Sequence, residues 1–215
     1  RMIDAKQTEG SQAAAEAIAG GLMQSNADNA LFPYVNGAPN NNPLSEDFKT
    51  RNDFAASNVM VDELLRLSDP RVGFYYAPTE ASVQGGNPTF VGEVYGLTED
   101  DAATTTDNTI SQRSSQVLAE SAPGIYLDYA QVEFMLAECA ERGIAGAGAA
   151  ATHYADGITA SMNYWDAAGT LTPTDISNYL ASPEVDYTTL IGNGETWRQV
   201  VGRQKWIALY GQGIQ

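Results

Sequence analysis

Residues 124–162, GIYLDYAQVEFMLAECAERGIAGAGAAATHYADGITASM, predict two helices joined by a short glycine-rich turn. In the first helix the apolar residues recur at steps of three and four, so they share one face. These residues are Tyr129, Val132, Leu136 and Cys139–Ala140. Asp128 suits the N-cap of this helix, and Gly143 suits the left-handed residue that closes it.

The second helix of this pair carries one apolar stripe, which consists of Tyr154, Ile158 and Met162. Small residues lie between the large ones, at Ala150, Gly157 and Ala160. Small residues opposite large ones allow two helices to approach closely. The stretch therefore predicts an antiparallel helical hairpin that forms the packing centre of the chain.

Further helices are expected over residues 4–19, 57–68, 172–182 and 195–210 from apolar periodicity. The first three also have a capping signal: Asp4-Ala-Lys-Gln resembles a capping box, Ser57 suits an N-cap, and Thr172 suits an N-cap followed by proline. Residues 25–53 are rich in Asn, Pro, Gly and Ser and predict a long loop. Residues 71–121 lack a sustained helical period, and Thr89–Val94 alternates as a short edge strand would. The expected fold is mainly α, with long irregular loops, in a single domain over residues 1–215.

The charge of the chain limits its partners. Eleven basic and 27 acidic residues leave a formal net charge of −16. A negative field does not attract nucleic acid or anionic lipid, whereas neutral ligands such as sugars are compatible with it. The one cysteine, Cys139, excludes an internal disulfide and any site with several cysteines.

The two ends of the chain indicate a segment of a longer protein. It begins at Arg1-Met2-Ile3, with neither an initiator methionine nor a cleavage pattern, and it stops at Gly213-Ile214-Gln215 directly after a helical pattern. No apolar run is long enough to span a bilayer. We expect an incomplete segment, for which the absence of a secretory signal says nothing about the parent protein.

Several patterns that resemble chemical sites have simpler structural interpretations. His153 has no recognisable nucleophile motif around it, so a surface or partly packed histidine is favoured. Cys139 is favoured as a structural thiol, and Glu138 with Arg142 as an ion pair on a helix surface. The acidic residues Glu99–Asp101 and Asp107 lack the spacing of a calcium loop. We therefore predict no cofactor and leave calcium as a possibility.

Aromatic residues in the irregular region are the candidates for ligand binding. Tyr75, Tyr76, Phe90 and Tyr95 lie among Gly, Pro and Asn residues, with Asn87 between them. Flat amphipathic rings beside amide groups suit a sugar, which has an apolar face and many hydroxyls. The alternative interpretation is that these rings fill the gap between loops and helices.

Three stretches resemble the SusD/RagB family of outer-membrane nutrient-binding lipoproteins. They are Tyr129–Gly143 with Tyr154–Met162, the sequence RQKWIALYGQG from Arg203, and Phe54–Ser68 followed by Asp69-Pro-Arg71. The resemblance is to the middle-to-late segment of the family. It implies tetratricopeptide-like helical hairpins of the α-α superhelix type, without catalysis.

The resemblance also implies a location and partners. Family members are surface-exposed lipoproteins that hand glycans, or in some relatives peptides, to a SusC-like TonB-dependent transporter. The signal peptide and the lipidated cysteine would lie outside this chain, so any membrane attachment is expected only through that anchor. No ligand residue is carried over, because ligand residues follow no motif in the family.

Three functions remain open at this point. The first is non-catalytic binding of nutrient oligosaccharides for delivery to the transporter. The second is a helical-repeat module that binds only another protein. The third is a glycoside hydrolase with two carboxylates, which the missing nucleophile motifs and the family resemblance both disfavour.

Overall fold

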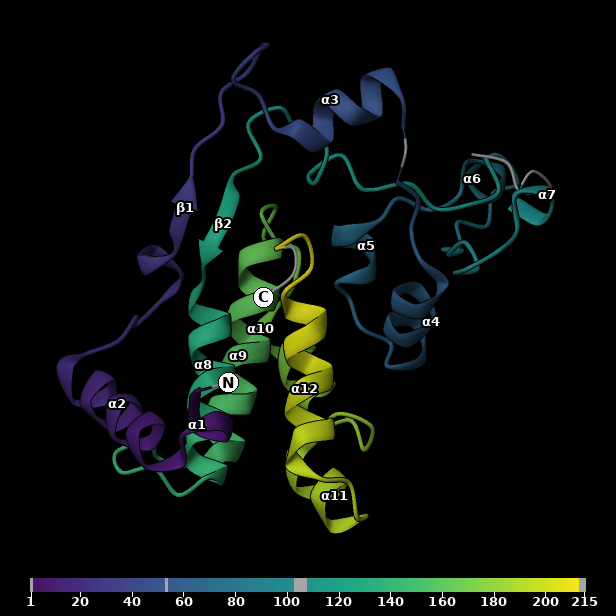
Figure 1. The fold of residues 1–215 in the computed structure, drawn as a ribbon. Helices are drawn as coiled ribbons and strands as arrows, with labels where there is room; N and C mark the ends of the chain where they lie inside the picture. Colours follow the sequence, from purple (N-terminus) through teal and green to yellow (C-terminus); the bar gives the residue numbers. More distant parts are fainter. Residues whose placement is uncertain (1, 53, 103–107, 213–215) are drawn as a thin grey trace. The chain divides into compact units, whose positions relative to one another are not determined.

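A computed structural model describes residues 2–52, 54–102 and 108–212 (Figure 1). The chain divides into two compact units, and the single domain predicted from the sequence stays a prediction. Unit 1 consists of Arg1–Leu31 with Ile125–Gln215, and unit 2 consists of Phe32–Gly124. Each unit is described by itself.

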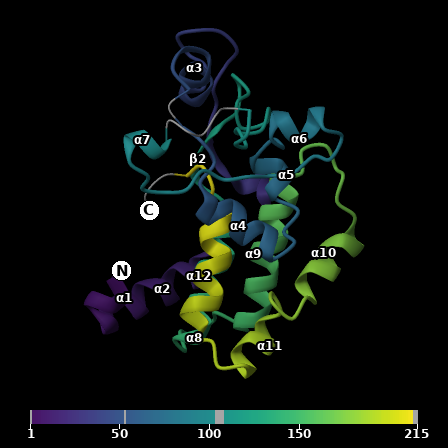
Figure 2. The same cartoon turned by 90° about the vertical axis from the view of Figure 1, so that its right-hand side faces the viewer.

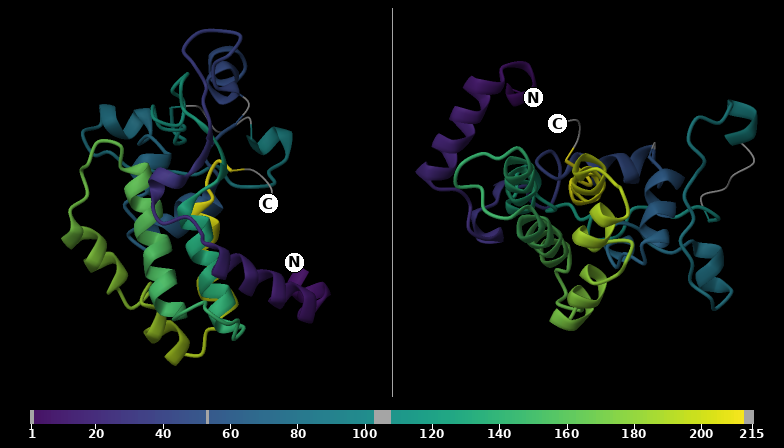
Figure 3. Two further views of the ribbon diagram at one scale, coloured as in Figure 1. Left: turned by 90° about the vertical axis from the view of Figure 1, so that its left-hand side faces the viewer. Right: turned by 90° about the horizontal axis from the view of Figure 1, so that it is seen from below.

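Three long helices form the centre of unit 1. They are α8 (Tyr129–Glu141), α9 (Ala150–Trp165) and α12 (Trp197–Ala208), and each contacts the other two. Seen from below, the three are viewed nearly along their axes (Figure 3). The α8–α9 pair is the predicted hairpin, and the mainly α fold is confirmed.

Local capping groups fix the ends of these helices. The Asp128 carboxylate accepts a hydrogen bond from the backbone N–H of Gln131 at 2.7 Å, which caps α8 as predicted. Gly143 follows α8 with a φ of +69°, a left-handed conformation that glycine adopts without strain. Thr196 caps α12 in a reciprocal capping box with Gln199.

The approach of α8 to α9 depends on one glycine. A Cβ atom at Gly157 would lie 3.0 Å from the Phe134 ring, and Phe134 is fully buried. Ile158 and Met162 are also fully buried, as the predicted stripe of α9 requires. The sequence prediction for this face of the hairpin is confirmed.

The predicted face of α8 is wrong in part. Leu136 and Cys139 are only half-buried, whereas Phe134 and Ala137 are fully buried. The reason is that α8 contacts both α9 and α12, so its buried surface is wider than one stripe.

Two short helices flank α9 and α12. They are α10 (Pro173–Leu180) and α11 (Tyr187–Gly192), which lie on the chain between α9 and α12 (Figure 2). Thr172 and Asp175 form the capping box of α10, and Pro173 occupies its first position, as predicted. The Tyr154 hydroxyl donates a hydrogen bond to the Val185 carbonyl at 2.9 Å, which ties this segment to α9.

The N-terminal helix is interrupted. The prediction was one helix over residues 4–19, but α1 (Met2–Ala5) and α2 (Gln7–Gly20) are separated at Lys6, whose φ is −142°. Asp4 pairs with Arg142 at 2.8 Å instead of forming the expected capping box. A single-turn helix η1 (Asn26–Asp28) follows, capped by Ser25.

Strands β1 (Ala30–Phe32) and β2 (Gly124–Leu127) pair as a two-stranded sheet in the described chain. The chain leaves unit 1 at the end of β1 and returns to it at the start of β2. The two ends of the long segment between them are therefore held together.

Unit 2 contains short helices joined by irregular loops. They are α3 (Pro43–Thr50), α4 (Asn58–Arg66), α5 (Val72–Tyr75), α6 (Glu80–Gln84) and α7 (Glu99–Ala102). The prediction of an uninterrupted loop over residues 25–53 missed α3, which Asn42 caps and Pro43 begins. Thr89–Val94 is not a strand; Glu93 makes an isolated bridge to Ser57.

A buried ion pair closes the turn after α4. The Asp69 carboxylate accepts hydrogen bonds from Nε of Arg71 at 2.9 Å and from Nη2 at 2.6 Å. Neither side chain is exposed to solvent. Two parallel bonds match the planar guanidinium to the carboxylate and hold the Asp-Pro-Arg turn between α4 and α5.

None of the helices in the described ranges combines the length and the apolar character needed to cross a bilayer.

Gly157→Ala is expected to lower the free energy of unfolding by about 1 kcal/mol. The new methyl group presses on the buried Phe134 ring, and this overpacking outweighs the gain in helix propensity. Gly202→Ala in α12 is the matched control, because no atom lies within 4 Å of its Cβ position. The control should gain about 0.5–1 kcal/mol in urea denaturation. Equal changes in the free energy of unfolding for the two substitutions would contradict the close contact between Gly157 and the Phe134 ring.

Asp69→Ala is expected to lower the free energy of unfolding by about 3–5 kcal/mol, because it removes the carboxylate from a fully buried guanidinium. Glu63→Ala breaks the exposed Glu63–Arg66 pair on α4 and should cost at most about 1 kcal/mol. Urea denaturation followed by circular dichroism measures both. A loss below 1 kcal/mol for Asp69→Ala would show that the buried pair is not important for stability.

Candidate ligand-binding site

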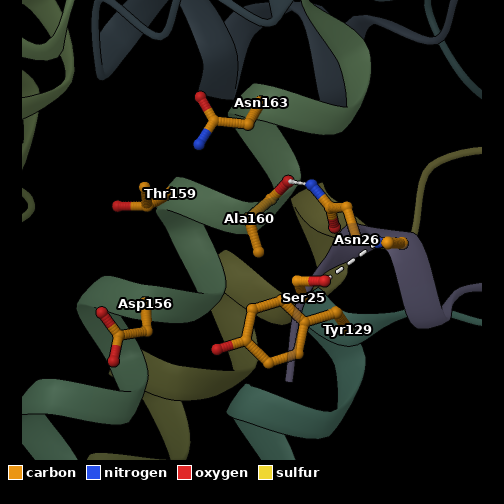
Figure 4. Close-up of a pocket in the computed structure, with 8 residues that line it drawn as sticks. Ser25, Asn26, Tyr129, Asp156, Thr159, Ala160 and Asn163 are labelled. Carbon is orange, nitrogen blue, oxygen red and sulfur yellow. Dashed lines mark hydrogen bonds between the residues drawn. The ribbon is translucent and has the colours of Figure 1, made fainter. Parts of the chain in front are cut away.

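Unit 1 contains a hollow of about 480 Å³ between η1 and one side of α8 and α9. We call it the α9 hollow. Its lining residues are Ser25, Asn26, Ala27, Tyr129, Asp156, Thr159, Ala160 and Asn163 (Figure 4). Volumes of a few hundred Å³ are typical of small-molecule sites.

Helix α9 provides one wall of the hollow. Asp156, Thr159 and Asn163 follow one another at steps of three and four, so their side chains lie on one side of the helix (Figure 4). This polar stripe runs beside the buried stripe of Tyr154 and Ile158. The wall therefore presents a carboxylate, a hydroxyl and an amide.

The opposite wall is the single turn η1, which two long-range hydrogen bonds fix in place. The Asn26 side-chain amide donates to the Ala160 carbonyl at 2.9 Å, and the backbone N–H of Tyr129 donates to Oδ1 of Asn29 at 2.7 Å. Oδ1 of Asn26 is buried and accepts no hydrogen bond in the structure. The two bonds hold the η1 turn against α8 and α9.

Tyr129 supplies the aromatic ring of the hollow. Burial, together with a hydrogen bond to the Glu133 carboxylate, raises the pKa of the Tyr129 hydroxyl to about 12. The hydroxyl therefore stays protonated and acts as a donor to Glu133. This bond fixes the ring at the base of the hollow.

Glu133, His153 and Asp156 lie together at the α8–α9 contact next to the hollow. Oε2 of Glu133 lies 2.6 Å from Nδ1 of His153. One ligand-type atom from each of the three residues lies within 4.8 Å of the others. Asp156 is exposed, and partial desolvation together with the nearby Glu133 charge raises the pKa of its carboxyl. Of the described residues, these three are the group with donor atoms suited to a metal ion.

The five residues predicted from the sequence are in unit 2. Tyr75 and Tyr76 are 0% and 4% exposed, and their rings meet edge to face with centroids 6.4 Å apart. Buried rings offer no face to a ligand, so the alternative interpretation, in which they fill the gap between loops and helices, accounts for both. Phe90 is half-buried, and its ring lies next to Gly73: a Cβ atom added to that glycine would be 3.9 Å from Cζ of Phe90.

Tyr95 and Asn87 are the exposed members of the predicted set. Tyr95 is 84% exposed, and its backbone N–H donates to Oδ1 of Asn58 at 3.1 Å. Asn87 follows α6 and its backbone N–H donates to the Ser82 carbonyl at 3.0 Å. A role for Phe90, Tyr95 and Asn87 in ligand binding stays a prediction.

The other candidates have structural roles. Glu138 pairs with Arg142 at 2.8 Å, as predicted. Cys139 is half-buried, and burial raises the pKa of its thiol, so its reactive thiolate form is disfavoured. Asp107, which belongs to the acidic run considered for calcium, lies outside the described residues.

The hollow was not predicted from the sequence. Asp156, Thr159 and Asn163 form a polar stripe at helical spacing, and this signal alone was available in the sequence. Asn26 lies 134 residues before Ala160 and contributes the opposite wall. No local pattern relates the two segments.

Tyr129→Phe is expected to lower the free energy of unfolding by about 1–3 kcal/mol at neutral pH, because the buried Glu133 loses a donor. Tyr95→Phe changes an exposed ring and should leave the free energy of unfolding unchanged. The pKa of the Tyr129 hydroxyl is about 12 in the folded state and 10 in the unfolded state. The unfolded state therefore loses this proton first, and the free energy of unfolding falls as the pH rises from 10 to about 12. Urea denaturation across this range should show a smaller fall in Tyr129→Phe than in wild type, and equal falls would contradict the Tyr129–Glu133 bond.

Comparison with solved structures supports the fold. A SusD homologue from Bacteroides fragilis NCTC 9343 is 23% identical with a TM-score of 0.79, covering 97% of this chain and 47% of that one. A chitin-binding protein is 22% identical with a TM-score of 0.77, covering 97% and 45%. A second SusD homologue from the same organism is 25% identical with a TM-score of 0.70, covering 89% and 44%.

The chain spans about half the length of these structures. Comparison with curated proteins finds no match. The profile of the SusD-like_2 family, described as starch-binding and associating with the outer membrane, matches residues 1–215. Since the match extends over the whole chain, this protein belongs to the SusD-like family of outer-membrane-associated, non-catalytic binding proteins.

Proposed function

We propose that this chain is part of a cell-surface protein that binds nutrient glycans and delivers them to a TonB-dependent outer-membrane transporter. The observation that carries the proposal is the α9 hollow, in a chain whose family is described as starch-binding. The hollow combines one aromatic ring with hydroxyl, amide and carboxylate groups. These are the groups that bind the hydroxyls and the apolar face of a sugar.

The charge of the chain supports a neutral ligand. Asp156 lines the hollow, and no lysine or arginine is among the lining residues. With a net charge of −16, the protein repels anionic ligands at long range.

The exposed segment around Tyr95 is a second candidate for the glycan site. Tyr95 has an exposed ring and Asn87 is an exposed residue with an amide, which are the kinds of group predicted from the sequence. We propose Tyr95, Phe90 and Asn87 as the alternative site, to be separated from the hollow by substitution.

A protein partner is favoured by apolar exposure in the same part of unit 2. Val59, Val94 and Tyr95 are each more than half exposed. The backbone N–H of Asn58 donates to the Glu93 carbonyl at 2.8 Å, so the two stretches that carry these side chains run side by side. Single exposed apolar residues are ordinary, but neighbouring ones suit a protein contact such as the transporter.

Glycan binding is tested by isothermal titration with maltooligosaccharides and chitooligosaccharides after an array has selected the best ligand. Asn163→Ala in the hollow is expected to weaken binding about tenfold, which corresponds to the loss of about 1.4 kcal/mol. Asn178→Ala, on the exposed side of α10, is the matched control and should bind as wild type does.

Tyr95→Ala is compared in the same titration with Phe48→Ala, an exposed aromatic residue of α3. A loss in Tyr95→Ala alone would move the site from the hollow to the loops. If both Asn163→Ala and Tyr95→Ala bind the glycan as tightly as wild type, neither location is the glycan site. If no glycan binds while a barrel-type transporter co-purifies with the chain, the function is protein binding alone.

A further inference from the structure

Two helices bring three metal-binding side chains together at the edge of the α9 hollow. His153 and Asp156 are three residues apart on α9, so both project from the same side of the helix. Glu133 faces them from α8, with Oε2 at 2.6 Å from Nδ1 of His153. The acid–histidine spacing of one helical turn, completed by a carboxylate on the facing helix, is an arrangement from which helical bundles build metal sites.

The two carboxylates have one imidazole, that of His153, as their nearby basic partner in the described part of the chain. Glu133 is 5% exposed, and neither it nor Asp156 has a lysine or arginine partner in the described part of the chain. A buried carboxylate beside a second carboxylate is unfavourable unless a positive charge accompanies it.

We propose that Glu133, His153 and Asp156 bind a divalent transition-metal ion of the zinc class. One imidazole nitrogen and two carboxylate oxygens suit Zn²⁺, which takes such ligands at about 2.0–2.2 Å in tetrahedral geometry. Ca²⁺ requires six to eight oxygen ligands, and Mg²⁺ an octahedron of oxygens, so the histidine disfavours both.

The surroundings of the three side chains fit this assignment. The Tyr129 hydroxyl donates to Glu133 and orients that carboxylate from outside, as outer partners of metal ligands do. Gly148 lies behind His153, and a Cβ atom there would be 3.0 Å from Nε2 of the ring. Two tetrahedral ligands are about 3.3 Å apart, so the 2.6 Å contact must widen by a small side-chain rotation.

The fourth position of the ion would face the hollow. Asp156 belongs both to the three-residue cluster and to the lining of the hollow. A water molecule or a hydroxyl of the bound molecule would complete the coordination there. The cluster also joins α8 to α9, so the ion would stabilise the hairpin whatever occupies the hollow.

The test is titration of the chain with ZnCl₂ in the absence of glycan, followed by calorimetry. The expected result is one saturable ion per chain. Asp156→Asn and His153→Gln should each weaken it about tenfold or more. Asp62→Asn makes the same charge change on an exposed position of α4 and should bind zinc as wild type does.

Co²⁺ is the spectroscopic probe. His153 is the sole histidine, so a visible absorption band that disappears in His153→Gln identifies imidazole as a ligand. Circular dichroism establishes that the variants fold, which is expected for the exposed Asp156. Zinc uptake that is unsaturable, or equal in all variants, would be adventitious binding to surface carboxylates and would overturn the proposal.

Calcium gives a further comparison. Saturable Ca²⁺ binding as tight as Zn²⁺ binding and unaffected by His153→Gln would overturn the assignment to the zinc class. Because no glycan is present, failure of glycan binding has no bearing on this result.

Discussion

The contact between the Gly157 backbone and the Phe134 ring sets the distance between α8 and α9, and the chemistry of unit 1 depends on it. Glu133 precedes Phe134 on α8, while Asp156 precedes Gly157 on α9. A wider separation of the helices would part Glu133 from His153, which are now 2.6 Å apart. It would also remove Tyr129 from the hollow beside Asp156. A packing constraint in the core thus determines the geometry of polar groups at the surface.

Two buried charged side chains of this protein have specific partners. Arg71 has the Asp69 carboxylate in unit 2, and Glu133 has a phenol and an imidazole in unit 1. In the first pair the two opposite charges cancel, and its role is structural. The second lies beside the α9 hollow, next to the further carboxylate of Asp156. That difference is why the α8–α9 contact, and not the buried pair, is the place to look for a ligand.

The sequence predicted what is decided locally. The caps at Asp128, Thr172 and Ser57 and the left-handed Gly143 follow from a few neighbouring residues, and all are confirmed. Helix α3 was missed because its signals, Asn42 and Pro43, lie in a polar stretch that resembles a loop. The burial of Tyr75 and the wall at Asn26 depend on residues distant in sequence, which periodicity cannot relate. The family resemblance predicted the class of the fold, but it could not supply a site.

The pairing of β1 with β2 has a consequence for how the chain tolerates change. Asn26 and Asn29 come just before β1, and Tyr129 comes just after β2, so both flanks of the intervening 91-residue span from 33 to 123 are tied to unit 1 independently of its content. We therefore expect changes of length or sequence in the loops of that span to disturb the hollow less than changes in its own walls.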